Sequence, residues 1–316
     1  MTGQEASMYM DQLGMQREPF LFIIDFEMKR PMVYPLSNLP DEISYELNIP
    51  GDSSCQFPAL DVDPVSLEAY SVKFNQVIDH LNYGNTYLLN LTCNTPIRTK
   101  LNLEEVYQYS KARYKLLLED KFVVFSPEPF IKISNGRIHS FPMKGTIRSD
   151  VPNAKSVILN NEKEIAEHAT IVDLIRNDLG MVSSSVRVDK YRYVEEVMTN
   201  AGNILQVSSE VSGVLEDDYM QNLGQLIFTL LPAGSISGAP KPKTLEIISE
   251  VENRERGYFT GVFGVFDGSD IDSAVMIRFI EKTPQGFIYK SGGGITAKSR
   301  LSEEYSEMID KVYVPY

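Results

Sequence analysis

Three short apolar runs follow one another before the middle of the chain, and turn residues separate them. Phe122–Phe125 and Phe130–Ser134 are rich in β-branched and aromatic residues, which favours strands. Asn135-Gly136 is the dipeptide typical of a two-residue hairpin turn, and it leads into a third strand at Arg137–Ser140. Two-residue turns join antiparallel neighbours, whereas parallel strands need a long crossover. The chain is therefore expected to build antiparallel sheets.

The rest of the chain alternates helical and extended patterns. Apolar residues at helical spacing predict helices at Val65–Tyr83, Leu103–Leu118, Ala154–Asp178, Met220–Leu231, Lys243–Glu252 and Ser302–Val312. Apolar runs bounded by turn residues predict strands at Phe20–Ile24, Met32–Tyr34, Thr86–Cys93, Val186–Val197, Ile204–Leu215, Gly261–Phe266, Ser273–Phe279 and Gly286–Ser291. The polar segment Asp41–Ala59 is predicted to be a loop. Groups of strands with helices between them favour a layered α+β fold over strict βαβ alternation.

Composition excludes several classes of partner. The chain has 316 residues, 43% of them hydrophobic, which is enough for a large core. A net charge of −13 argues against nucleic acid, and an anionic substrate would need local cations. No apolar run reaches the roughly 18 residues of a membrane span, and Met1–Arg17 lacks a signal-peptide pattern. Cys55 and Cys93 do not form a Cys-x-x-Cys motif, so a cytoplasmic protein with reduced cysteines is expected.

A single lysine stands out in the turn-like segment Ser140–Thr146. Lys144 lies between a nearby proline, which fixes φ, and Gly145, which permits unusual backbone angles. A lysine presented in this way can act as an amine nucleophile if its surroundings lower its pKa. The alternative is an ordinary solvated loop lysine.

Two carboxylate pairs suggest a divalent cation. Glu164 and Glu167 lie three residues apart in one predicted helix, and Glu304 and Glu307 repeat this spacing in the last one. The two carboxylates of each pair lie on the same helix face and repel each other unless a cation neutralises them. Carboxylate oxygens suit Mg²⁺, which accepts few protein ligands. Two solvated acidic faces are the alternative.

Segments rich in glycine and small residues can bind anions through backbone N–H groups. They are Ser291–Ile295, Pro232–Lys241 and Gly257–Gly264. None of them matches the phosphate-loop or dinucleotide patterns, which disfavours a nucleotide enzyme. Each can equally be a tight turn. Arg278, at the end of an apolar strand, can grip a carboxylate or form a structural ion pair.

Taken together, these segments resemble the chorismate-utilising enzymes, which include anthranilate, aminodeoxychorismate, isochorismate and salicylate synthases. The resemblance implies one catalytic domain over residues 1–316, with short strands and a loop over 1–64 and the family core over 65–316. It also implies two large antiparallel β-sheets packed as a sandwich with outer helices. The matching stretches, in the family's order, are Ser126–Glu128, Pro142–Thr146, Glu167–Asp178, Gly234–Lys241, Arg256–Tyr258 with Gly261 and Gly264, Ile277–Arg278, Gly292–Ile295 and Ser302–Lys311.

The resemblance also implies a metal site and an acid. Glu167 and Glu307 would ligate Mg²⁺ directly, with Glu164 and Glu304 supporting it through water. The metal would hold the ring carboxylate of chorismate. Glu128 would protonate the departing C4 hydroxyl.

The same resemblance implies the groups that bind chorismate. Tyr258 and Arg278 would bind its enolpyruvyl carboxylate. Lys241 would add positive potential, and Ser237 keeps the hydroxyl of the threonine that is usual in the family. The backbone would also help to hold chorismate at Gly292, Gly293 and Gly294.

Lys144 indicates the branch of the family. Aminodeoxychorismate synthases carry lysine at this position, whereas anthranilate synthases typically carry alanine. The implied product is 4-amino-4-deoxychorismate, the precursor of p-aminobenzoate and folate, formed through a covalent Lys144 intermediate. Nearby cations and the metal would favour the neutral amine. No cysteine and histidine fit a glutaminase site, so ammonia would come from a separate glutamine amidotransferase subunit.

Two further positions refine this interpretation. Leu88 stands where isochorismate and salicylate synthases carry a lysine base, and leucine cannot take a proton. Many amine-adding members carry glutamine there, so leucine also departs from their pattern. Gln206 replaces a histidine that is common in the family, which fits a product that keeps its pyruvyl group. The alternatives are anthranilate synthase component I, which is a lyase, and a non-catalytic homologue, which retention of so many site residues disfavours.

Overall fold

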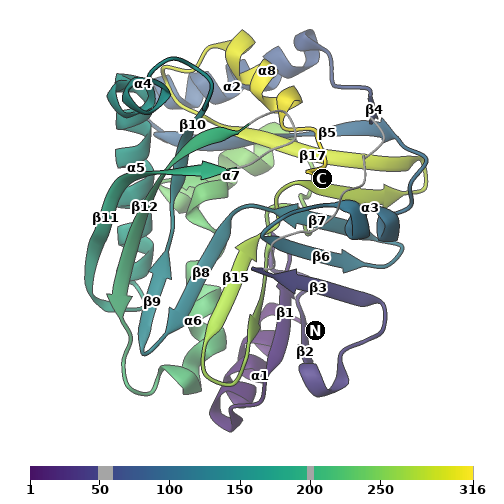
Figure 1. Ribbon diagram of the computed structural model, residues 1–316, viewed down its shortest axis with the longest axis vertical. Helices are drawn as coiled ribbons and strands as arrows, with labels where there is room; N and C mark the ends of the chain where they lie inside the picture. The colour runs from purple at the N-terminus through teal and green to yellow at the C-terminus, as the bar shows by residue number, and fades with distance from the viewer. Residues whose placement is uncertain (49–59, 198–202, 316) are drawn as a thin grey trace.

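Two antiparallel sheets dominate the computed structural model, which describes residues 1–48, 60–197 and 203–315 (Figure 1). The first sheet has nine strands, in the order β10 (Met143–Arg148), β12 (Ile204–Val214), β9 (Arg137–Ser140), β8 (Pro129–Ser134), β15 (Ile271–Val275), β14 (Val262–Phe266), β1 (Phe20–Ile24) and β2 (Met32–Pro35), with β11 (Ser184–Val197) beside β12. The second has eight, in the order β13 (Gly238–Ala239), β5 (Leu88–Arg98), β17 (Gly286–Ile295), β16 (Phe279–Thr283), β7 (Phe122–Ser126), β6 (Tyr114–Leu118) and β3 (Ile43–Leu47), with β4 (Asp61–Val62) beside β5.

Strand β1 shows how the sheets stack. All five of its residues are buried, and successive side chains of a strand point to opposite faces. Phe20 and Phe22 share a core with α1 and α6, whereas Leu21 and Ile23 share another with β6 and β7 of the second sheet. One face of the first sheet therefore meets helices, and the other meets the second sheet.

The helices lie outside the two sheets. Helix α5 packs on β10, β11 and β12 of the first sheet, while α2, α7 and α8 pack on β5 or β17 of the second. The predicted α+β sandwich of two antiparallel sheets with outer helices is confirmed. None of the described helices is long and apolar enough to cross a membrane. The helices are α1 (Gly3–Gln16), α2 (Leu67–Tyr83), α3 (Leu103–Tyr109), α4 (Ala154–Asn160), α5 (Glu162–Gly180), α6 (Leu223–Leu230), α7 (Lys241–Glu252) and α8 (Leu301–Asp310), with 3₁₀ turns η1 (Leu36–Asn38), η2 (Tyr219–Asn222) and η3 (Gly234–Ile236).

Three predicted elements have wrong boundaries. The strand predicted over Ser273–Phe279 is divided, since β15 ends at Val275 and β16 begins at Phe279. The helix predicted over Leu103–Leu118 ends at Tyr109, and its last five residues form strand β6, which is buried along its whole length. A segment that is apolar on both faces carries no periodicity to separate helix from strand. The loop predicted over Asp41–Ala59 contains β3, which pairs with β6, and residues 49–59 lie outside the described part of the chain, as does Cys55.

Two helix termini were also missed. The helix predicted over Ala154–Asp178 breaks at Asn161, whose side chain accepts a hydrogen bond from the N–H of Glu164 and begins α5. Helix α1 was not predicted, although Thr2 and Glu5 form a capping box at its start.

Candidate active site

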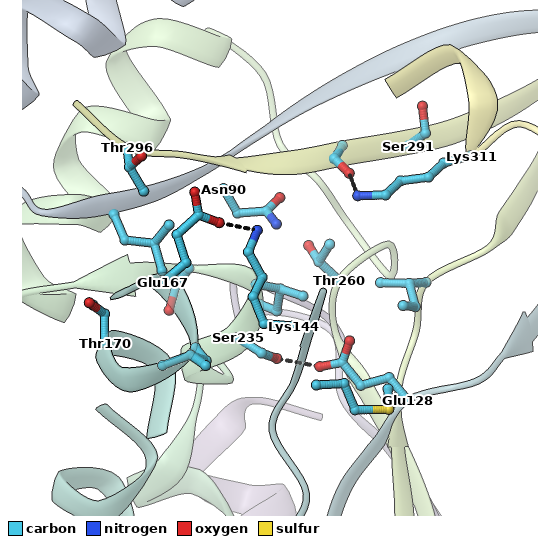
Figure 2. Close-up of a pocket in the computed structure, with 18 of the residues that line it drawn as sticks. Asn90, Glu128, Lys144, Glu167, Thr170, Ser235, Thr260, Ser291, Thr296 and Lys311 are labelled. Atoms are coloured by element: carbon cyan, nitrogen blue, oxygen red, sulfur yellow. Dashed lines mark hydrogen bonds and ion pairs between the residues drawn. The ribbon is translucent and has the colours of Figure 1, made fainter. Parts of the chain in front are cut away.

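A cavity of about 340 Å³ lies where β5 and β17 of the second sheet face β10 and α5 (Figure 2). Five basic side chains and two acidic ones line it, so basic residues outnumber acidic ones in this lining although the protein as a whole is acidic. This satisfies the expectation that an anionic substrate needs local cations. The seven charged residues of the lining are Lys144, Arg278, Lys290, Lys298, Lys311, Glu128 and Glu167.

Lys144 reaches the cavity from a bulge in β10, not from a turn as predicted. Met143 pairs with Ser208 and Thr146 with Gln206, so two residues of β10, Lys144 and its neighbour, oppose one residue of β12. A bulge bends the strand and redirects a side chain. The neighbour, Gly145, has φ +94°, a backbone conformation that favours glycine.

The ammonium group of Lys144 lies against acidic side chains. Its Nζ atom is 2.9 Å from Oε2 of Glu167 (Figure 2). Burial alone would lower the pKa of Lys144, but the carboxylate of Glu167, followed by those of Glu307 and Glu164, raises it overall. These carboxylates favour the charged form of the amine, so the predicted neutral amine requires a change in these neighbours.

The four predicted metal-binding glutamates lie on two helices, one of which packs on the first sheet and the other on the second. Helix α5 presents Glu164 and Glu167, and α8 presents Glu304 and Glu307. A Cβ atom placed on Gly293 would lie 3.7 Å from Oε2 of Glu304 and from Oε1 of Glu307. Glu164 and Glu304 are in the first turns of their helices, where the helix dipole stabilises negative charge.

This donor set fits the hard, oxygen-seeking ion Mg²⁺. Lysine ammonium groups already pair with two of the carboxylates: Lys144 with Glu167 at 2.9 Å and Lys311 with Glu307 at 2.7 Å. One glutamate on each helix therefore already lies against a positive charge.

Glu128 faces the same cavity from the connection between β7 and β8. Its Oε1 atom accepts a hydrogen bond of 2.5 Å from the hydroxyl of Ser235 (Figure 2). Burial raises the pKa of Glu128 and outweighs the opposing effects of Ser235, Arg278 and Lys311. A carboxyl group with a raised pKa keeps its proton longer, which suits a general acid.

Two basic groups lie beside Glu128. Arg278 joins β15 to β16 with φ +54°, and its guanidinium lies over the ring of Tyr313 at 5.1 Å. Lys311 donates a hydrogen bond of 2.9 Å to the carbonyl of Gly292. Lys311 and Lys290 were not among the predicted site residues, although Lys311 follows Glu307 by one helical turn, and this spacing indicates a shared face.

Tyr258 and Lys241 are not among the described residues that line the cavity. The hydroxyl of Tyr258 donates to the carbonyl of Arg30 at 2.7 Å. Lys241 pairs with Asp178 at 3.0 Å and donates to the carbonyl of Leu230. These partners lie far away in the sequence, so no local pattern could reveal them. The structure does not bring these two predicted residues to the lining of the cavity.

The three glycines belong to strand β17, not to a loop. Gly292, Gly293 and Gly294 pair with β5, whereas the pairing of β17 with β16 ends at Lys290. Gly292 and Gly294 line the cavity beyond that point, so the site presents a strand there in place of the predicted nest. Ser237 also lines the cavity, and its hydroxyl donates to the carbonyl of Ala233 at 2.9 Å.

A buried ion pair holds two walls of the cavity together. Arg256, 1% exposed, pairs with Glu252 at 2.7 Å. It also donates to the carbonyls of Asn90 and Ile236, at 2.6 and 2.9 Å. Strand β5 is thereby fixed to turn η3.

Leu88 and Gln206, which depart from the family pattern, lie in different surroundings. Leu88 lines the cavity and offers no proton acceptor there. The amide of Gln206 donates to the sulfur of Met143, and of these two residues Met143 lines the cavity.

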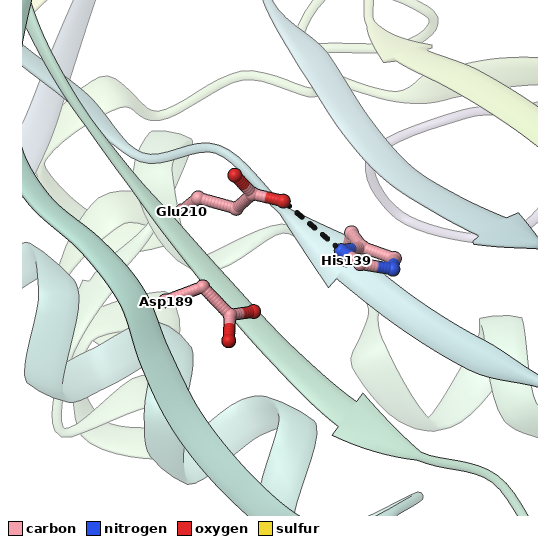
Figure 3. Close-up of side chains that lie close together, drawn as sticks. All are labelled: His139, Asp189 and Glu210. Carbon is pink, nitrogen blue, oxygen red and sulfur yellow. Dashed lines mark ion pairs between the residues drawn. The ribbon is translucent and has the colours of Figure 1, made fainter.

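A second group of possible metal ligands lies on β9, β11 and β12. His139, Asp189 and Glu210 place ligand atoms within 4.8 Å of one another (Figure 3). Each carboxylate already has a cationic partner, since Lys190 pairs with Glu210 at 2.9 Å and Arg187 pairs with Asp189. These side chains form a cross-strand charge network on the sheet.

Residues 41–315 match the family of chorismate binding enzymes, and the chain belongs to this family. It is 48% identical to a PabA-like protein of Pasteurella multocida over 96% of both chains. It is 34% identical to aminodeoxychorismate synthase component 1 of Salmonella typhimurium, over 77% of this chain and 56% of that one. An isochorismate synthase of Bacillus anthracis shares the fold, with a TM-score of 0.74 at 20% identity over 98% of this chain and 86% of that one.

Proposed function

We propose that the chain converts chorismate and ammonia into 4-amino-4-deoxychorismate, on the route to p-aminobenzoate and folate. The observation that carries this proposal is the position of Lys144, a lysine on a strand bulge whose amine faces the cavity that also contains Glu128. Ammonia would come from a separate glutamine amidotransferase subunit.

The reaction has two displacements. The Lys144 amine forms a bond to C2 of chorismate, the ring double bond shifts, and the C4 hydroxyl leaves as water with a proton from Glu128. Ammonia then bonds to C4 and the double bond shifts back. The lysine leaves C2 as the free amine, so the net change is the exchange of a hydroxyl group for an amino group with loss of water.

The charges of the cavity suit a dicarboxylate such as chorismate. Arg278 and Lys311 would hold one carboxylate, because both line the cavity beside Glu128. Glu167 and Glu307 would hold Mg²⁺, with Glu164 and Glu304 in support. The ion, when bound, would neutralise the ring carboxylate and these glutamates. Leu88 cannot act as a base that activates a water molecule. This disfavours the hydration of chorismate to isochorismate.

The test is an incubation with chorismate, Mg²⁺ and ammonium, with the products identified by mass spectrometry. The wild type is expected to form aminodeoxychorismate that keeps its pyruvyl group. Lys144→Ala is expected to lose at least about 100-fold in rate, since it removes the nucleophile. Lys243→Ala is the matched control, because Lys243 is exposed on α7 and pairs with Glu246 outside the cavity.

The other outcomes separate the alternatives. Anthranilate with free pyruvate would place the chain with the lyases. Chorismate binding without turnover, even with a glutaminase partner supplied, would indicate a non-catalytic protein. Equal rates for Lys144→Ala and the wild type would exclude the covalent step.

A further inference from the structure

We propose that His168 is a positioning residue for Lys144. It holds the carbonyl of the peptide between Lys144 and Gly145, and so fixes the direction in which the lysine enters the cavity. The inference rests on the proposed function, since it takes Lys144 as the nucleophile. His168 itself is fully buried and is not among the described residues that line the cavity, so it acts through Lys144.

The bulge in β10 creates the need for such a group. Regular pairing with β12 stops after Met143 and resumes at Thr146, so the backbone of Lys144 lies in the irregular part of the strand. Buried carbonyl groups need a hydrogen-bond donor. Nδ1 of His168 lies 3.3 Å from the carbonyl oxygen of Lys144 and supplies such a donor.

The orientation of the His168 ring is fixed from its other nitrogen. The Lys144 carbonyl oxygen can only accept a hydrogen bond, so Nδ1 of His168 carries the ring hydrogen and donates to it. In the neutral imidazole Nε2 then has no hydrogen, and it accepts from the hydroxyl of Ser209 at 2.7 Å. The N–H of Arg192 donates to the same hydroxyl oxygen at 2.9 Å and holds Ser209 in place. Nδ1 carries a hydrogen in the charged ring as well, so the contact with Lys144 does not depend on titration.

The network continues into rigid elements. The guanidinium of Arg192 donates to the carbonyls of Ile158 and Leu159 at the end of α4, at 3.2 and 2.9 Å. The ring of Tyr191 meets that of His168 edge-on, with centroids 5.9 Å apart. This network therefore connects one peptide group of β10 to helices α4 and α5 and to strands β11 and β12. A buried residue with this many constraints can hold a backbone carbonyl to the tolerance that nucleophilic attack requires.

Two substitutions separate the functions of the two ring nitrogens. His168→Asn places an amide N–H near the position of Nδ1 and keeps a donor for Lys144. His168→Gln places its amide near Nε2 and keeps only the contact with Ser209. His168→Ala removes both. Ala169→Ser is the control, because Ala169 is exposed on the same helix and does not line the cavity.

Two measurements are needed: kcat and KM for chorismate, and hydrogen exchange of the peptide that contains residues 143–148. Gln and Ala variants are expected to lower kcat by roughly 10- to 100-fold with little change in KM. Their β10 amides should exchange about 3- to 10-fold faster. His168→Asn should stay near the wild type in both measurements.

The exchange measurement needs no substrate, so it tests the anchoring of β10 even if the proposed amination fails. Unchanged exchange in the Gln and Ala variants would overturn the inference, as would equal loss of kcat in the Asn and Gln variants. If these variants do not fold, Ser209→Ala keeps the ring and removes only its orienting hydroxyl. It should then give a smaller change in the same direction, and no change would overturn the inference.

Discussion

At the scale of single residues, the neighbours of Glu128 decide whether it can act as an acid. Burial raises its pKa above the usual value of 4.5, and the hydrogen bond from Ser235 is the largest effect in the opposite direction. A hydroxyl that donates to a carboxylate stabilises the ionised form. Ser235 therefore limits how far burial raises the pKa of Glu128.

Ser235→Ala should move the alkaline limb of the kcat profile to higher pH. The reacting form is the protonated acid, so activity falls as pH rises through the raised pKa of Glu128. Removing the hydroxyl removes an effect that lowers this pKa, and the limb moves up. The measurement is kcat against pH with Ser71→Ala as control, since Ser71 hydrogen-bonds within α2 at Glu68. A limb that moves to lower pH would exclude Glu128 as the acid.

At the scale of elements, the sequence predicts what local pattern controls. The hairpin at Asn135-Gly136 and the helix that ends at Gly84 are found as predicted, because positive φ at these glycines is a local property. Strand β6 was predicted to be helical because both of its faces are buried. Its sequence therefore lacks the alternation of apolar and polar residues that identifies a strand. The bulge at Lys144 depends on β12 across the sheet, so sequence reasoning could find the lysine but not the geometry that aims it.

The same distinction applies to the glycines of β17. They were predicted to form an anion-binding loop or a tight turn, yet they lie in a strand, and a side chain at Gly292 would collide with the neighbouring strand. A Cβ atom there would lie 2.6 Å from the carbonyl oxygen of Leu91 and 2.9 Å from Cγ2 of Thr92. Glycine is required here because β5 and β17 approach each other closely, and a long-range contact of this kind leaves no local signal.

Gly292→Ala should therefore destabilise the fold by about 1–3 kcal/mol, the usual cost of overpacking. Urea denaturation measures this directly. Gly180→Ala is the matched control, because Gly180 lies in α5 with nothing within 4 Å of the added methyl group. That change should be neutral, or stabilising by up to about 1 kcal/mol through helix propensity. Equal stability of Gly292→Ala and the wild type would contradict the close approach of the two strands.

At the scale of the whole molecule, the site depends on parts of both sheets. Helix α5 packs on β10 and β12 of the first sheet, while α8 packs on β17 of the second. A cation held by Glu167 and Glu307 would connect these two halves. The protein carries a net charge of −13, so these glutamates add to the repulsion within the fold, and Lys144 and Lys311 oppose it at Glu167 and Glu307.

Mg²⁺ should therefore stabilise the whole fold. An ion that binds only the folded state adds about 2.7 kcal/mol at a concentration of 100 times its Kd, so Tm should rise by several degrees. Glu167→Gln and Glu307→Gln should each remove most of this rise. Glu246→Gln should keep it, because Glu246 is exposed on α7 and pairs with Lys243. Scans with Na⁺ at matched ionic strength separate binding from screening. If Na⁺ gives the same rise, or if Glu246→Gln loses it equally, Mg²⁺ does not bind between the two helices, and the glutamates then serve as partners of Lys144 and Lys311.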